Sequence, residues 1–132
     1  MYKIEKTNYG VRLTFGDFIE KPEMEKWLTE SRELLPSLRK PFGNLIDMRT
    51  LKPLPADSAP VIQQGQALYK QSGMERSCVI LQSETVAMQF KRIARASGIY
   101  SFERYLAADT TPDWETKAID WIKNGIDPDA SR

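Results

Sequence analysis

The sequence predicts a single α/β domain with a mixed β-sheet, on three observations. The chain has 132 residues, which is about the length of one domain. Apolar residues repeat every second position in some segments and with the period of a helix in others. These segments follow one another as a strand pair and then as alternating helices and strands. We therefore expect an opening hairpin, about four helices, a domain over residues 1–125 and a flexible tail over residues 126–132.

The first elements are a hairpin, a helix and a buried strand. Residues 4–7 and 11–15 are short β-type runs around the turn-forming sequence Asn8-Tyr9-Gly10. A helix is expected over residues 22–36, because the apolar positions lie on one stripe and Pro22 suits a first turn. Residues 42–48 form a nearly continuous apolar run, which is typical of a buried strand.

The second helix and the next strand follow a proline-stiffened loop over residues 49–57. The helix is expected from Ser58 to Ser72, and Gly73 is suited to end it. Gly65 in its middle favours close packing against the sheet, and the alternative is a tolerated defect that costs about 1 kcal/mol relative to Ala. Residues 77–82 form the clearest strand of the chain.

The last third of the chain repeats the same order. Ser83 is placed to cap a third helix, which Gly98 ends. Another strand is expected over residues 100–106. Thr111-Pro112-Asp113 then opens a last helix, which stops at Asn124-Gly125.

Composition excludes several kinds of enzyme. The chain has no His and one Cys, so His-based acid–base catalysis, a Ser–His–Asp triad and a Cys–His pair are excluded, together with nearly every zinc site. Asp47 and Asp57 supply too few oxygen ligands to predict a cation site. We expect no metal, no cofactor and no catalytic residue, and we expect Cys78 to be a core residue of a reducing compartment.

No segment predicts a membrane span or a leader. The longest apolar runs, such as residues 78–81, have only a few residues, against roughly 20 for a transmembrane helix. The first residues carry an acid and lack the apolar stretch of a signal peptide. A cytoplasmic protein is therefore expected.

The charges are distributed unevenly. The formal net charge is +1, but the middle of the chain is basic and its end is acidic. Lys91, Arg92 and Arg95 share one side of the third helix, either as a surface for an anion or acidic partner or as a solvated face. No reading motif or aromatic-interleaved basic stripe is present, so a nucleic-acid partner is not expected.

Ser58 follows Asp57 where a loop enters a helix. Its hydroxyl is expected near free backbone amides, where a phosphate is well accommodated. The alternative is that Asp57 or Ser58 only caps the helix. Gln63, Gln64, Gln66 and Gln71 form the expected polar outer face of this helix, suited to a partner or to water.

Trp27, Trp114 and Trp121 lie at inward positions of their helices. Core packing is the favoured explanation. The alternative is that the bulky rings lift the helices off the sheet and enclose an apolar pocket.

The strand end Asn44-Leu45-Ile46-Asp47-Met48-Arg49 and the helix entry Asp57-Ser58 resemble the SpoIIAA-like branch of the STAS domain superfamily. The resemblance covers roughly residues 2–124, mainly as topology. It implies a non-catalytic signalling module in which Asp47 matches the acid at the strand end and Ser58 the phosphoacceptor of anti-sigma factor antagonists. Those antagonists continue with a small residue and a glycine, whereas this chain has Ala59-Pro60.

The resemblance implies a bacterial regulatory domain that binds a protein through the loop and helix from Arg49 to Gln66. The implied partner is a kinase or a regulator of the anti-sigma type, and a homodimer is a further alternative. The residues expected to bind the partner are Asp47, Arg49, Asp57, Gln63 and Gln66. The segment 73–77 looks more like uncharacterised STAS-like proteins, whose fold is similar to lipid-binding CRAL-TRIO domains. A carrier of a small, lipid-like apolar ligand is therefore the second function expected.

Overall fold

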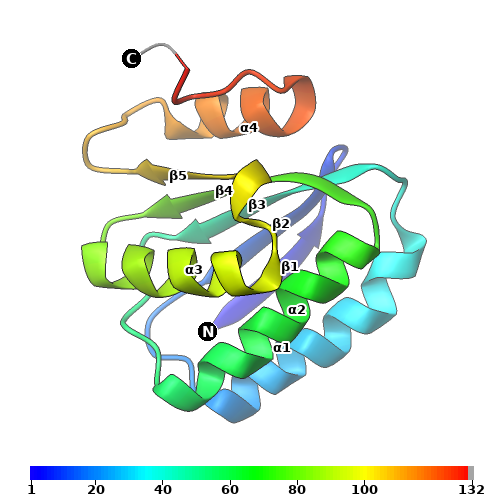
Figure 1. Ribbon diagram of the computed structural model, residues 1–132, viewed down its shortest axis with the longest axis vertical. Helices are drawn as coiled ribbons and strands as arrows, with labels where there is room; N and C mark the ends of the chain where they lie inside the picture. The colour runs from blue at the N-terminus through cyan, green and yellow to red at the C-terminus, as the bar shows by residue number, and fades with distance from the viewer. Residues whose placement is uncertain (131–132) are drawn as a thin grey trace.

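The structure is a computed structural model that describes residues 1–130. Its centre is a five-stranded sheet whose strands lie side by side in chain order (Figure 1). The first pair is antiparallel and the other three pairs are parallel. The strands are β1 (Tyr2–Lys6), β2 (Gly10–Phe15), β3 (Phe42–Met48), β4 (Met74–Leu81) and β5 (Glu103–Ala107).

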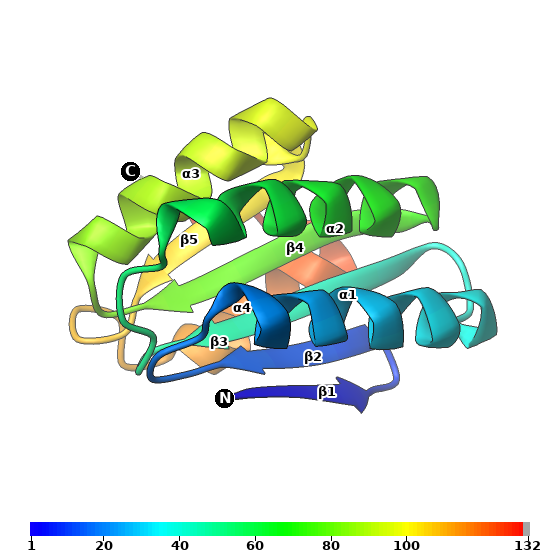
Figure 2. The same ribbon diagram turned by 90° about the horizontal axis from the view of Figure 1, so that it is seen from below.

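Three helices cover one face of the sheet and the fourth covers the other (Figures 1 and 2). The first face carries α1 (Lys21–Leu34), α2 (Ala59–Gln71) and α3 (Glu84–Ser97), and the second carries α4 (Trp114–Asn124). The predicted class, an α/β fold with a mixed sheet and four helices, is thus confirmed. Because strand order follows chain order, the sheet has no topological switch point at which such folds bind ligands.

The core has two layers, as the alternation of side chains along each strand requires. On β4, Val79 and Leu81 pack under α2 and α3, whereas Cys78 and Ile80 pack under α4. Cys78 has no exposed surface, which confirms its assignment to the core.

The predicted helix ends are mostly correct. Ser83 accepts a hydrogen bond from the Val86 amide at 3.2 Å, and Gly98 and Gly125 take the left-handed conformation after α3 and α4. Gly65 does allow close packing, but its neighbour is the indole ring of Trp27 on α1 and not the sheet.

Several predicted boundaries differ from the structure. The first strand is Tyr2–Lys6 rather than residues 4–7, and β4 begins at Met74 rather than at residue 77. The last strand begins at Glu103 rather than at residue 100, because a short 3-10 turn occupies Tyr100–Phe102. The α2 helix begins at Ala59, because the 3-10 turn Ala56–Ser58 precedes it.

The described part of the expected tail makes several contacts: Ile126 N donates to Asp120 O at 3.2 Å, and Arg104 lies near both Asp127 and Asp129. Asp127 accepts two hydrogen bonds from Arg104, at 2.9 and 3.0 Å. Residues 131–132, the end of that tail, lie outside the described residues.

Candidate functional site

An aromatic side chain projects from the end of the sheet where the parallel strands finish. Phe18 is 75% exposed. The preceding residue, Asp17, has φ +58°, a left-handed conformation that costs a non-glycine residue about 1 kcal/mol or more. Backbone hydrogen bonds join Asp17 N to Thr50 O (3.0 Å) and Lys52 N to Asp17 O (2.9 Å). The exposure of Phe18 is therefore imposed by a well-anchored backbone.

The loop that receives these bonds is itself held in place. Leu51 and Leu54 are buried in the core. The side-chain amide of Gln89, on α3, donates to Leu54 O and accepts from Leu54 N, both at 3.0 Å. The β2–α1 and β3–α2 connections lie side by side in Figure 2. We call the exposed residues Phe18, Thr50, Lys52 and Pro53 the Phe18 surface.

Asp47 and Arg49 form an ion pair beside this loop. Arg49 donates through Nε to Asp47 Oδ1 at 3.0 Å and through Nη2 to Oδ2 at 2.9 Å. Arg12 Nη2 lies 3.8 Å from Asp47 Oδ2. Burial raises the pKa of Asp47, but the hydrogen bonds and charges of Arg49 outweigh it, so this pKa lies below its usual value. Asp47 is therefore an anionic anchor that orients Arg49.

Helix α4 completes this ion-pair cluster from the second face of the sheet. The guanidinium of Arg49 lies over the Trp114 ring, 4.6 Å from its centre. Arg12 Nη1 donates to Glu115 Oε2 at 2.7 Å. Trp114 is half-buried beneath the two arginines, so the prediction that it is a core residue is only partly correct. Trp27 and Trp121 are buried, as predicted.

Ser58 lies where neither sequence interpretation places it. Its side chain has no exposed surface and makes no capping hydrogen bond. Its backbone is already helical, with φ −81° and ψ −24°, whereas a capping residue has extended dihedrals. The expected exposed hydroxyl at a helix N-terminus is therefore wrong. Phosphorylation of Ser58 would require the junction before α2 to open.

The other predicted partner-binding residues separate into two groups. Asp57 and Gln63 are exposed, near the start of α2. Gln66 is half-buried, and its Oε1 accepts from Ser97 Oγ at 2.7 Å. The prediction that Gln66 belongs to the outer face of the helix is wrong, because this residue faces α3.

Two of the three basic-patch residues contact tyrosines. Lys91 Nζ lies 5.2 Å from the centre of the Tyr105 ring. Arg95 lies over Tyr100, 4.3 Å from the ring centre, and donates to its hydroxyl at 3.2 Å. Arg92 is exposed. These contacts favour a structural role for Lys91 and Arg95 at the α3–β5 edge.

A buried row of polar side chains crosses the sheet beneath α2, and sequence reasoning missed it. The strand register places Asn44 beside Ser77, and Ser77 beside Glu103, on three neighbouring strands. Ser77 Oγ donates to Glu103 Oε2 at 2.7 Å, and the Tyr105 hydroxyl donates to Oε1 at 2.6 Å. Asn44 Oδ1 is buried without a hydrogen-bond partner. The available signal was a polar residue near the start of each of three apolar strands.

Burial determines the protonation of this row. Desolvation raises the pKa of Glu103 to about 7, against the opposing effect of the two hydroxyl donors. Glu103 is thus a carboxyl group that titrates near neutral pH inside the core. Its two hydroxyl donors stabilise the ionised form, so it is burial alone that favours the protonated carboxyl group.

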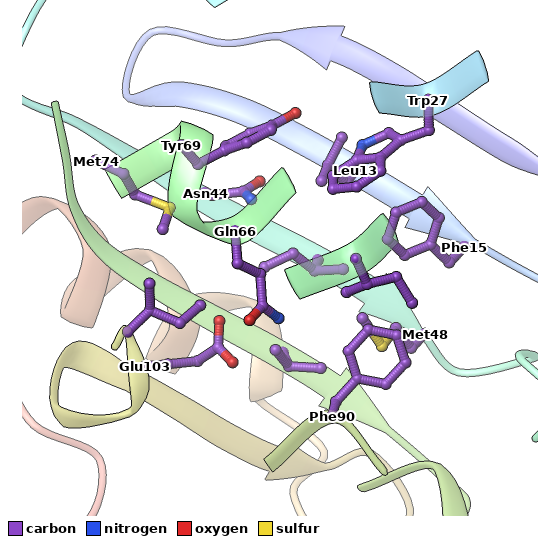
Figure 3. Close-up of a pocket in the computed structure, with 14 residues that line it drawn as sticks. Leu13, Phe15, Trp27, Asn44, Met48, Gln66, Tyr69, Met74, Phe90 and Glu103 are labelled. Atoms are coloured by element: carbon purple, nitrogen blue, oxygen red, sulfur yellow. The ribbon is translucent and has the colours of Figure 1, made fainter. Parts of the chain in front are cut away.

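The polar row borders a cavity of about 30 Å³ between the sheet and the helices. Figure 3 shows Gln66 reaching down from α2 toward Glu103, with Asn44 on the sheet beneath Tyr69. A volume of this size holds about two water molecules, whereas a lipid-like ligand needs at least about 300 Å³. The cavity beside Trp27 is thus far smaller than the predicted carrier pocket.

Within residues 1–130, none of the helices combines the length and apolar character that crossing a membrane requires. In the same part of the chain, no three acidic or cysteine side chains gather in a way that would hold a metal ion. Comparisons with protein-family models, with curated proteins and with solved structures found no match to this chain.

Proposed function

We propose that this chain is a non-catalytic regulatory domain of the STAS type that binds a protein partner through the Phe18 surface. The observation that carries the proposal is the 75% exposure of Phe18 on a backbone held by Asp17. Aromatic side chains, including Phe, are enriched in protein interfaces relative to the rest of the surface. A rigid aromatic also loses little conformational entropy when it is buried.

Neighbouring groups suit the same role. The β3–α2 loop is anchored by Asp17 and by Gln89, so the surface around Phe18 is formed before a partner arrives. Arg49 is 40% exposed, and Asp47 orients it. The partner we propose therefore offers an apolar pocket for the Phe18 ring and acidic groups for Arg49 and Lys52.

The regulatory part of the proposal does not use a kinase. Because Ser58 is fully buried, we assign partner choice to shape and charge at the Phe18 surface. The STAS relationship is part of the proposal and is supported by the order of elements and by the strand end at Asp47. The carrier alternative has no supporting observation, because the cavity beside Trp27 holds about two water molecules.

The test is affinity capture with three forms of the full chain. Unaltered protein, Phe18→Ala and Met88→Ala are immobilised in parallel, and proteins retained from a bacterial lysate are quantified by mass spectrometry. Met88 is the matched control, because it is an apolar residue of α3 that is 65% exposed and is not one of the four residues of the Phe18 surface.

We expect the retention of at least one protein to fall about tenfold or more with Phe18→Ala, which is the effect of replacing a strong interface residue. The retention of the same protein should be unchanged with Met88→Ala. Equal retention by all three forms would contradict the proposal.

A further inference from the structure

One of the two edges of the sheet is formed by β1, the other being β5, and among residues 1–130 no strand lies beyond β1 (Figure 2). An edge strand presents backbone donors and acceptors to which another strand can pair. The groove between β1 and α1 is open and is bordered by Tyr2, Ile4 and Phe18. This edge is therefore geometrically able to accept one more strand.

The hydrogen bonds to β2 determine which backbone groups of β1 face outward. Gly16 N donates to Met1 O at 2.9 Å, and Thr7 N donates to Gly10 O at 2.9 Å. In an antiparallel pair, the residues that bond to the partner strand alternate. Odd-numbered residues of β1 thus bond to β2, and the N–H and C=O groups of Tyr2, Ile4 and Lys6 point away from the sheet.

We propose that β1 pairs with β1 of a second copy of this chain, antiparallel and about a two-fold axis at Ile4. Ile4 then exchanges both backbone hydrogen bonds with Ile4 of the partner subunit. Tyr2 and Lys6 do the same with Lys6 and Tyr2 of the partner subunit, for a total of about six bonds. The two sheets become one continuous sheet.

The charges on β1 are self-complementary only in this register. Lys3 and Glu5 are exposed on one face of the strand, with side chains 61% and 43% accessible. Pairing about Ile4 places Lys3 opposite Glu5 of the partner subunit, twice by symmetry. A register centred on residue 3 places two lysines opposite each other, and one centred on residue 5 places two glutamates. Opposite charges in such pairs stabilise a sheet, whereas like charges destabilise it.

Apolar contacts on the other face support the same arrangement. Ile4 is half-buried at the centre of β1, and at the two-fold axis it meets its own copy. Tyr2 is held in place because its hydroxyl donates to Glu30 Oε1 at 2.6 Å. This inference uses β1 and does not rest on partner binding at Phe18.

The test uses two charge reversals separately and mixed. Sedimentation equilibrium gives the dimer dissociation constant of the full-length protein, of Lys3→Glu and of Glu5→Lys. Each variant alone places like charges in both cross-strand pairs, so we expect the constant to rise about tenfold. Lys123→Glu is the control, because this exposed residue lies on α4 and not on β1. The dimer dissociation constant of this variant should equal that of the parent protein.

The mixture of Lys3→Glu with Glu5→Lys is the decisive sample. In a mixed dimer, the two carboxylates on β1 of the first variant face the two ammonium groups on β1 of the second, although each chain alone carries like charges. Native mass spectrometry should therefore find the mixed dimer in excess over both homodimers. The proposal would be overturned if the parent protein were still monomeric at about 100 µM, which is a concentration typical of weak binding. It would also be overturned if the mixed dimer and the two homodimers formed in statistical proportions.

Discussion

At the scale of single residues, Glu103 is the most unusual group of the protein. A carboxyl group in a core is normally paired with a cation, because burying its charge is costly. Here its two partners are hydroxyl groups, from Ser77 and Tyr105, and its pKa is raised to about 7. The folded protein therefore holds a proton that the unfolded chain releases at lower pH.

This proton makes stability depend on pH. The folded-state pKa of about 7 exceeds the ordinary value of 4.5, so the stabilising contribution is complete below pH 4.5 and is lost as the pH rises through 7. We expect the free energy of unfolding to fall by about 3 kcal/mol across this range relative to Glu103→Gln.

Urea unfolding of both proteins at several pH values measures this difference. The amide that Glu103→Gln introduces keeps one acceptor for the hydroxyl donors and cannot ionise. Parallel pH curves for the two proteins would show that Glu103 has no raised pKa.

At the scale of elements, α1 and α2 approach each other through one glycine. A Cβ atom at Gly65 would overlap the indole ring of Trp27. That ring stacks on Tyr69 with centres 5.8 Å apart, and Phe15 packs against it edge to face. The glycine therefore determines how close the two helices lie, and it positions the aromatic groups of the core.

Gly65→Ala tests this contact, because the expected change in the free energy of unfolding has the opposite sign to the usual one for this substitution in a helix. At an exposed helix position the change stabilises by about 1 kcal/mol. Here overpacking costs about 1–3 kcal/mol, so we expect a lower melting temperature in thermal unfolding. Gln64→Ala, at an exposed position of the same helix, should change stability by less than about 0.5 kcal/mol. A Gly65→Ala protein more stable than the parent would show that the helices can move apart freely.

At the scale of the whole molecule, β4 lies inside the sheet between β3 and β5 and under helices on both faces. Its Cys78 is the only cysteine of the chain. Burial raises the pKa of this thiol to about 12, and a thiol of that kind is unreactive until it is exposed. Labelling of Cys78 thus reports the opening of the central sheet.

We expect thiol labelling of the native protein to follow global unfolding. The labelling rate should increase with urea at the same slope as the equilibrium unfolding curve, since β4 opens only when the whole core does. A fast rate that is independent of urea would reveal local opening around β4.

Several features were predictable because their causes are local. The strand over residues 42–48 coincides with β3, since its apolar run is bounded by turn-forming residues. The cap at Ser83 and the glycine ends of α3 and α4 were also predictable, because each depends on the chemistry of one or two residues. Asp47 was correctly placed at the end of its strand, but its pairing with Arg12 required the register of β2 and β3.

Other features arise only when distant segments meet. A single phenylalanine is most often buried, and the exposure of Phe18 follows from backbone bonds between Asp17 and a loop more than thirty residues away in the chain. The burial of Ser58 depends on the turn before α2 and on the helices around it. Likewise, Asn44, Ser77 and Glu103 become one polar row only through the register of three strands.

The elements, their order and their apolar faces were therefore encoded in local periodicity and capping, because a residue's nearest neighbours decide those properties. Tertiary structure decided which polar groups lie together in the core, which aromatic side chain is exposed to solvent and which strands form the edges of the sheet. The physical reason is that burial and strand pairing depend on contacts between residues far apart in the chain.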